Sequence, residues 1–483
     1  MVHFVTIALL VGVASVQAAD FTIVDGQVVG QQTLATGETG IVEEGGTIST
    51  SGAVAIDATG GGSNMTIINR GTVTATGVGG TGIESDGNNA SITNSGSITT
   101  TGAGNEAIKS SGANATIINS GTITTSGSTA EGIQSQGNNA TIDNSGTVKV
   151  TGAGAIGISF SGTNATLTNS GTVSATGSAT TAIQGSANAD TLNLNAGSEI
   201  IGLIDLQGGT DTVIFGANTS AVLNIANAEN VSVLNGGTNF IQVGNIFTVV
   251  DPTGQSVNAT VLGSVTAGIH GAVTQHLAHS PAPPQLASTR VDPGMLSESR
   301  EPKLWVNGFG SHRERGQDGL ALAYDHDYYG FAGGYETNYR QYRVGFIGGY
   351  AHSDVVTDIA ATDNDSDSFF VGGYGQVGFG QVDLSITLLA GYERHDNDRR
   401  VVDSSNGIEI ARSEFGSFFL SPSLTLSGEY EFGNRHMFRP SATVVYSVAL
   451  HDDYTESGGA PQGRTCWSTN GFLRLSWGVY RWQ

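Results

Sequence analysis

The sequence predicts an all-β protein. A right-handed parallel β-helix of 25-residue rungs is followed by a short helical linker and then by an antiparallel transmembrane β-barrel, whose number of strands leaves open whether it is complete. Three observations lead to this prediction. A strict 25-residue repeat runs from Gly61 to Gly185, a weak helical stripe follows at 263–278, and apolar and polar residues alternate after Glu301. With 71 Gly and only 13% charged residues, the composition also lies outside the range of ordinary globular enzymes.

The first element is a predicted Sec signal peptide at residues 1–19. An apolar stretch from Phe4 to Val16 is followed by the small residues Ala18 and Ala19, although no Lys or Arg precedes it. Such a stretch is too short to span a bilayer. The only cysteine, Cys466, fits an exported protein that is stabilised without disulfides. We therefore expect the Sec translocon to act on this chain.

The second element, residues 20–250, is the predicted β-helix. Each 25-residue block carries three aliphatic positions separated by Gly and Asn, so it offers three strands too short to bury a face alone. Blocks of this kind become stable by stacking like positions above one another. Stacked asparagines are expected to pair their side-chain amides, and glycines to serve corners that need positive φ. The main amide column is Asn69, Asn94, Asn119, Asn144 and Asn169.

The charges and motifs of this element argue against several functions. Residues 20–250 hold three basic residues against sixteen acidic ones, a balance that repels nucleic acid. We find no G-x-S-x-G, H-E-x-x-H or Ser/His/Asp arrangement. Asp211 in "GGTDTVIFG" resembles one calcium-binding nonapeptide, but one copy cannot form paired half-sites, so we expect a turn aspartate. No catalytic, cofactor-binding or metal-binding residue is predicted.

The third element is a linker at residues 251–300. Apolar residues recur every fourth position within 263–278, which predicts a helix, with a disordered linker as the alternative. Three prolines, at positions 281, 283 and 284, end any such helix.

The fourth element, residues 301–483, alternates with a period of two. In "VDLSITLLAGYE", Leu384, Ile386 and Leu388 oppose Ser385 and Thr387. Segments of this kind reach about ten residues with aromatic residues near their ends, which suits tilted strands crossing a membrane. A soluble β-sandwich is the alternative.

This order of parts resembles the classical monomeric autotransporters of Gram-negative bacteria, the type V secretion family. The most specific match lies in "LWVNGFGS", "GFAGGYE" and "GYAHSD". The residues that carry it are Trp305, Gly308, Phe309, Gly330, Phe331, Gly334, Tyr335, Gly349 and Tyr350. The resemblance implies a pore-spanning helix at 263–278, a barrel in outer-membrane lipid that exports its own passenger with the barrel-assembly machinery, and a passenger at the cell surface.

The end of the chain departs from that family. Its barrels have about twelve strands and end on an aromatic residue, whereas seven or eight strands follow Glu301 here and the last residue is Gln483. The tail after about Gly463 holds the only Cys and three of the four Trp, which suggests a frameshift or truncation. The alternative is a smaller family variant whose eighth strand is "GFLRLSWGVY".

The function expected from these residues is a non-enzymatic adhesin or surface-interaction rod exported by its own barrel. It would act as a monomer, without cofactor, on a host or neighbouring-cell ligand that the residues do not identify. The alternatives are an autotransported β-helical enzyme, such as a polysaccharide hydrolase or lyase, and a non-functional truncated gene product.

Overall fold

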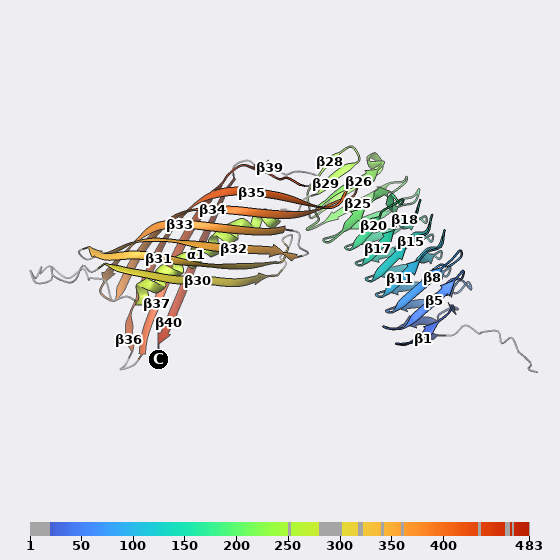
Figure 1. Ribbon diagram of the computed structural model, residues 1–483, viewed down its shortest axis with the longest axis horizontal. Coiled ribbons are helices and arrows are strands. Elements are labelled where there is room, and N and C mark those ends of the chain that lie inside the picture. The colour runs from blue at the N-terminus through green and yellow to red at the C-terminus, as the bar shows by residue number, and fades with distance from the viewer. Residues whose placement is uncertain are drawn as a thin grey trace, which may run out of the picture. The chain divides into compact units, whose positions relative to one another are not determined.

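A computed structural model gives the structure of the chain (Figure 1). It describes residues 20–249, 253–279, 302–316, 322–339, 342–358, 362–432, 436–458, 464–465 and 468–482. The predicted signal peptide and the proline-rich stretch lie outside these residues. The chain divides into two compact units, one running to Gly216 with Leu223–Gly236 and Gln242–Phe247, the other holding Thr248–Gln483 with two short segments before it.

The first unit is built from three parallel sheets, which confirms the predicted parallel β-helix. One sheet holds β1 (Phe21–Ile23), β4 (Thr39–Val42), β7 (Thr66–Asn69), β10 (Ser91–Asn94), β13 (Thr116–Asn119), β16 (Thr141–Asn144), β19 (Thr166–Asn169), β22 (Thr191–Leu194), β25 (Asp211–Gly216) and β27 (Val231–Gly236). The second holds β2 (Val28–Val29), β5 (Thr47–Ser51), β8 (Thr72–Thr76), β11 (Ser97–Thr100), β14 (Thr122–Thr125), β17 (Thr147–Val150), β20 (Thr172–Ala175) and β23 (Glu199–Ile201).

The third sheet includes β3 (Gln32–Thr33), β6 (Ile56–Ala58), β9 (Ile83–Ser85), β12 (Ile108–Ser110), β15 (Glu131–Ser135), β18 (Ile156–Phe160), β21 (Thr181–Gln184), β24 (Leu203–Asp205) and β26 (Ala221–Ala226). The turn η1 (Ala228–Asn230) and strands β28 (Phe240–Val243) and β29 (Ile246–Val249) follow. The stacked rungs run from blue to green in Figure 1.

The repeat sets the register between rungs. Ile92 pairs with Ile117 on β13, Ile98 with Ile123 on β14, and each partner lies 25 residues away in the sequence. All four side chains are fully buried. Each aliphatic position of the repeat therefore forms a ladder through the core, and burying such a side chain stabilises the fold by about 1.5–3 kcal/mol.

The structure confirms the role predicted for the glycines at some corners and corrects it at others. Glycine has a positive φ at several corners, among them Gly77, Gly104, Gly154 and Gly177, whereas one corner column consists of asparagine, with φ between 56° and 60°: Asn64, Asn89, Asn114, Asn139 and Asn164. The glycine column that includes Gly96 and Gly121 has no positive φ. Instead, a Cβ at Gly121 would lie well under 3.0 Å from the carbonyl oxygen of Gly96 in the preceding rung. Close backbone approach, rather than φ, requires these glycines.

We expect Gly121→Ala to destabilise the β-helix by about 3 kcal/mol, because the atom that the new Cβ meets is backbone and cannot move aside as a side chain can. Pulse proteolysis in urea on the full-length protein measures this change. The matched control is Gly104→Asn, since Gly104 has φ +65° and no atom lies within 4 Å of the position that a Cβ would take there, a site that suits asparagine. Equal stability of the two variants would contradict the close-approach explanation.

The second unit begins with helix α1 (Thr253–His279). The helical linker is thus confirmed, and it starts ten residues before the predicted stripe at 263–278. No helix among the described residues is both long and apolar enough to span a membrane.

Eight long strands follow α1: β30 (Lys303–Arg315), β31 (Tyr324–Tyr339), β32 (Tyr342–Thr357), β33 (Thr362–Phe379), β34 (Val382–Asp403), β35 (Gly407–Gly428), β37 (His436–His451) and β40 (Ser468–Trp482). Three short strands accompany them: β36 (Tyr430–Phe432), β38 (Tyr454–Thr455) and β39 (Arg464–Thr465). The long strands form one antiparallel sheet that curves around α1 (Figure 1). Within the described strands, each long strand pairs with the next, and none of the pairings joins β30 to β40.

Candidate functional site

The curved sheet has an inward face toward α1 and an outward face, and their polarity is the reverse of a water-soluble protein. On β34, outward Ile386 and Leu388 are 55% and 51% exposed, whereas inward Ser385 and Thr387 are buried. The same reversal recurs on the neighbouring strands, where Phe346 and Val371 are exposed. An apolar exterior around a polar interior is the arrangement of a transmembrane β-barrel.

Helix α1 lies against this inward face, which also carries apolar side chains such as Ile347, Phe370 and Leu389 that pack in one cluster with the helix. His270 uses both ring nitrogens, forming hydrogen bonds of 3.0 Å with Ser421 Oγ and 2.9 Å with Ser423 Oγ. Thr266 Oγ1 lies 2.8 Å from Ser447 Oγ, also at hydrogen-bond distance. Since His270 and Thr266 are both buried, these contacts satisfy polar groups that would otherwise be costly inside the unit.

Further hydrogen bonds hold the two ends of α1. Near the N-terminal end, Asn364 Nδ2 donates to Asn258 Oδ1 at 2.8 Å. At the C-terminal end, the guanidinium of Arg439 donates to the carbonyl oxygen of Ala278 at 2.8 Å. Lone carbonyls and partial negative charge gather at a helix C-terminus, so a cation there is stabilising. The helix is therefore attached to the sheet along its whole length.

A cluster around Glu336 forms the most polar contact between α1 and the sheet. Glu336 Oε2 lies 3.0 Å from His276 Nε2 of the helix and accepts a 3.1 Å hydrogen bond from Tyr374 Oη. Arg343 Nε lies 3.8 Å from Glu336 Oε1. Trp305 Nε1 donates to Tyr374 Oη at 2.8 Å, and the indole stacks on the His276 ring at 4.4 Å. We call these five residues the Glu336 cluster.

The barrel-signature residues predicted from sequence divide between the two faces of β30, β31 and β32. Trp305, Phe309, Gly330, Gly334 and Gly349 face inward, and Gly308, Phe331, Tyr335 and Tyr350 face outward. The structure brings the inward ones together as aromatic and glycine pairs. A Cβ at Gly334 would lie 2.5 Å from the Trp305 indole, and one at Gly330 would lie 2.7 Å from the Phe309 ring. Glycine on one strand thus makes room for an aromatic ring from the next.

The outward signature residues form a looser aromatic group. The rings of Phe331 and Tyr350 lie 6.3 Å apart, and Tyr350 lies 5.3 Å from Phe369 on β33. Gly308 also faces outward, but no aromatic ring packs on it. The nearest atom to a Cβ at this position would be a backbone oxygen 3.8 Å away. These rings suit the aromatic girdle of a membrane barrel.

The asparagine column of the β-helix forms a ladder of side-chain hydrogen bonds between successive rungs. Each side-chain amide donates to the next residue's Oδ1, at 2.7, 2.7, 2.8 and 2.7 Å along Asn69, Asn94, Asn119, Asn144 and Asn169. All five are fully buried. The last amide donates to Ser198 Oγ at 2.7 Å, which ends the column.

Asp211 is buried in a rung, where its Oδ1 accepts a 3.0 Å hydrogen bond from the backbone N–H of Asp190. Asp190 in turn accepts from the Ala165 N–H at 3.0 Å. Across the described residues, no group of three His, Cys, Asp or Glu side chains is placed to hold a metal ion. The carboxylates therefore cap backbone N–H groups.

Burial raises the pKa of the Asp211 carboxyl to about 6, although the hydrogen bond from the Asp190 N–H opposes this rise. The ordinary value in an unfolded chain is about 3.9. Because the folded pKa is the higher one, the unfolded chain loses this proton first, and stability should fall by about 2–3 kcal/mol as pH rises from about 4 to about 6. Asp211→Asn should flatten this window in urea unfolding followed at several pH values. An unchanged slope in the variant would exclude Asp211 as its source.

Sequence reasoning missed His276, Glu336, Arg343 and Tyr374. A signal for two of them exists, since Glu336 and Arg343 are charged residues at positions that the alternation of their strands places on the inward face. Nothing in the sequence pairs them with His276, which lies 60 residues from Glu336.

Two comparisons with known proteins give matches. A family model described as the autotransporter beta-domain matches residues 304–472. The solved structure of the translocator domain of autotransporter NalP from Neisseria meningitidis is similar at 14% identity, covering 47% of this chain and 72% of that chain, with a TM-score of 0.37. A likeness at this score is too weak to support the fold, which rests on the strands described above. No curated protein matches the chain.

Proposed function

We propose that residues 304–472, which match a family model described as the autotransporter beta-domain, export the β-helix as their passenger to the cell surface, where the passenger acts as a non-enzymatic adhesin or surface-interaction rod. The observation that carries the export proposal is the position of α1. The helix begins four residues after β29 ends and lies against the polar inward face of an apolar-exterior sheet. When a passenger is exported through a barrel, the segment that connects the two remains inside the barrel, and α1 occupies such a position.

The passenger supports binding through a long surface rather than a pocket. Hydroxyl side chains face outward at the same position of successive rungs, at Thr66, Ser91, Thr116, Thr141, Thr166 and Thr191. Neighbouring strands in a sheet lie about 4.8 Å apart. Such columns present a repeated array of hydroxyls and methyl groups, which suits a repetitive ligand on a host or neighbouring cell.

The partners that follow belong to the same proposal. Outer-membrane lipid surrounds the barrel, and the Sec translocon and the barrel-assembly machinery act during biogenesis. The exported chain works as a monomer, without a cofactor or nucleic acid.

The test is expression of the full chain in a Gram-negative host that lacks other adhesins. We expect a heat-modifiable band in the outer-membrane fraction and loss of the β-helix when protease is added outside intact cells. Cells should also settle or adhere, and shaving should abolish this. Degradation in the periplasm would contradict the export proposal. A hydrolase or lyase rate that a single carboxylate substitution removes would contradict the non-enzymatic passenger.

A further inference from the structure

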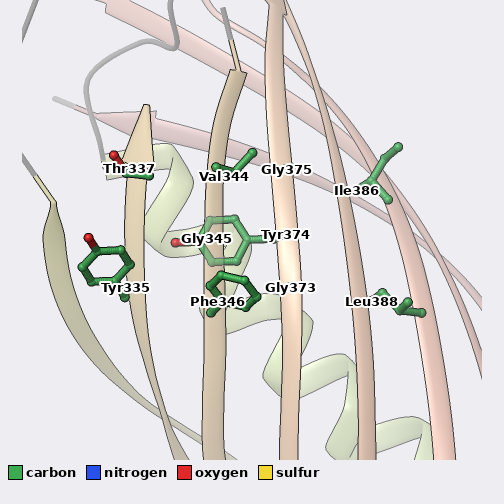
Figure 2. A pocket seen from close by; sticks show the side chains of 10 residues that line it. All are labelled: Tyr335, Thr337, Val344, Gly345, Phe346, Gly373, Tyr374, Gly375, Ile386 and Leu388. Atoms are coloured by element: carbon green, nitrogen blue, oxygen red, sulfur yellow. The ribbon is translucent and has the colours of Figure 1, made fainter. Parts of the chain in front are cut away.

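An apolar groove of about 390 Å³ lies on the outward face of the curved sheet, across β31, β32, β33 and β34 (Figure 2). Two rows of residues in register cross these strands and line it. One row is Tyr335, Phe346, Gly373 and Leu388, and the other is Thr337, Val344, Gly375 and Ile386. Within each row the third position is glycine, so the groove is one strand wide and its floor is the backbone of β33.

The fold itself does not require these two glycines. A Cβ at Gly373 would have its nearest neighbour, a backbone oxygen, 3.6 Å away, and one at Gly375 would have its nearest at 3.8 Å. Neither residue has a positive φ. Both distances are ordinary van der Waals contacts, in contrast to the inward Gly334, where a Cβ would overlap the Trp305 ring. Glycine inside a strand costs stability, and it commonly marks a place where a ligand approaches the backbone.

The walls of the groove are apolar. Phe346 and Val344, which are 75% and 38% exposed, form one wall, and Leu388 and Ile386 form the other. The two walls stand on strands separated by β33, so their backbones are about 9.5 Å apart, twice the spacing of neighbouring strands. A single extended hydrocarbon chain fits between them.

One end of the groove is polar. Thr337 lies in the row nearer to the short connection between β31 and β32, and the next row beyond it holds Tyr339 and Tyr342, which are 58% and 42% exposed. Tyrosines at this depth mark the membrane interface, and short connections lie at the periplasmic end of such barrels. The groove therefore runs from the periplasmic interface toward the middle of the membrane.

We propose that this groove binds one acyl chain of a glycerophospholipid from the periplasmic leaflet, with the glycerol and headgroup beside Thr337, Tyr339 and Tyr342. The proposal rests on the outer-membrane location proposed above. A second copy of the sheet is a poorer occupant, because its convex outward face would meet the walls at Phe346 and Leu388 before it reached the glycine floor. A flexible chain can lie along the floor and bury both.

The test uses the full-length protein, reconstituted in phosphatidylethanolamine nanodiscs and released in native mass spectrometry. We expect the unaltered protein to keep one phospholipid. The double variant Gly373→Val with Gly375→Val fills the groove and should lower the retained fraction at least tenfold. Gly333→Val is the matched control, since it adds the same side chain on the outward face outside the groove, with 3.5 Å to the nearest atom, and it should keep the lipid.

Heat modifiability confirms that each variant is folded. Phe346→Ala provides a second variant that removes a wall instead of filling the floor, and it should also lose the lipid. Equal retention by all four proteins, or no retention by the unaltered one, would overturn the proposal. A dimer mass that disappears in the double variant would overturn it in favour of a second copy. If the protein did not reach the outer membrane in cells, the proposed export function would be refuted. Lipid retention in nanodiscs is measured on purified protein, so it tests the lipid groove independently of export.

Discussion

Asn119→Ala is expected to lower the free energy of unfolding of the β-helix by about 3–5 kcal/mol. Asn94 Nδ2 donates to Asn119 Oδ1 at 2.7 Å, and Asn119 Nδ2 donates to Asn144 Oδ1 at 2.8 Å. The substitution leaves a donor on one neighbour and an acceptor on the other unpaired, and all three side chains are fully buried. Each buried group left without a partner costs about 1–3 kcal/mol. Pulse proteolysis in urea on the full-length protein measures the loss.

Asn114→Gly is the matched control from the same rung. Asn114 also takes part in an amide column, with a 3.1 Å bond to Asn89 Oδ1, but it is exposed and lies at a corner with φ 57°. Glycine keeps that backbone conformation, and water replaces both lost bonds, the one to Asn89 and the 3.2 Å bond from Asn139 Nδ2, so the change should stay within about 0.5–1 kcal/mol. If the two variants were equally stable, burial would not explain the contribution of the inner asparagine column to the free energy of unfolding.

Much of the β-helix could be predicted because its contacts repeat with the sequence. Once stacking is assumed, a 25-residue period places Ile92 beside Ile117 and Asn94 beside Asn119 without further information. The role of Gly121 could not be predicted this way. Positive φ and close backbone approach both favour glycine, and only coordinates tell which applies. The structure shows positive φ at Gly104 and at the column of asparagine corners, and close backbone approach at Gly121.

Less of the curved sheet could be predicted from the sequence. Alternation identifies which residues share a face, and the resemblance identifies Trp305 as part of a signature, but neither says what a side chain touches across the interior. Contacts of Trp305 with Tyr374 and His276 depend on how the sheet curves and on the rotation of α1 about its axis. The sequence carries little information on that rotation, since α1 is apolar on more than one side.

Glu336→Ala is expected to loosen α1 from the sheet and to lower the stability of the second unit by about 3–5 kcal/mol. The carboxylate bonds to His276 and Tyr374 and lies 3.8 Å from Arg343. The Glu336 and Arg343 side chains are only 5% and 4% exposed. Removing one partner of a buried charged pair leaves the other uncompensated, which accounts for a penalty of this size. Hydrogen exchange of the last turns of α1 and the temperature of the heat-modifiable transition report the two effects.

Glu414→Ala separates this effect from the loss of any carboxylate on the sheet. Glu414 accepts a 2.9 Å hydrogen bond from Arg394, but the two side chains are 70% and 59% exposed, and solvent screening reduces such pairs to about 0–1 kcal/mol. Glu336→Gln should lie between the two, because the amide keeps an acceptor for Tyr374 while losing the charge opposite Arg343. If α1 exchanged no faster in Glu336→Ala than in Glu414→Ala, the Glu336 cluster would not be what holds the helix inside the sheet, and its attachment would rest on His270 and Thr266 instead.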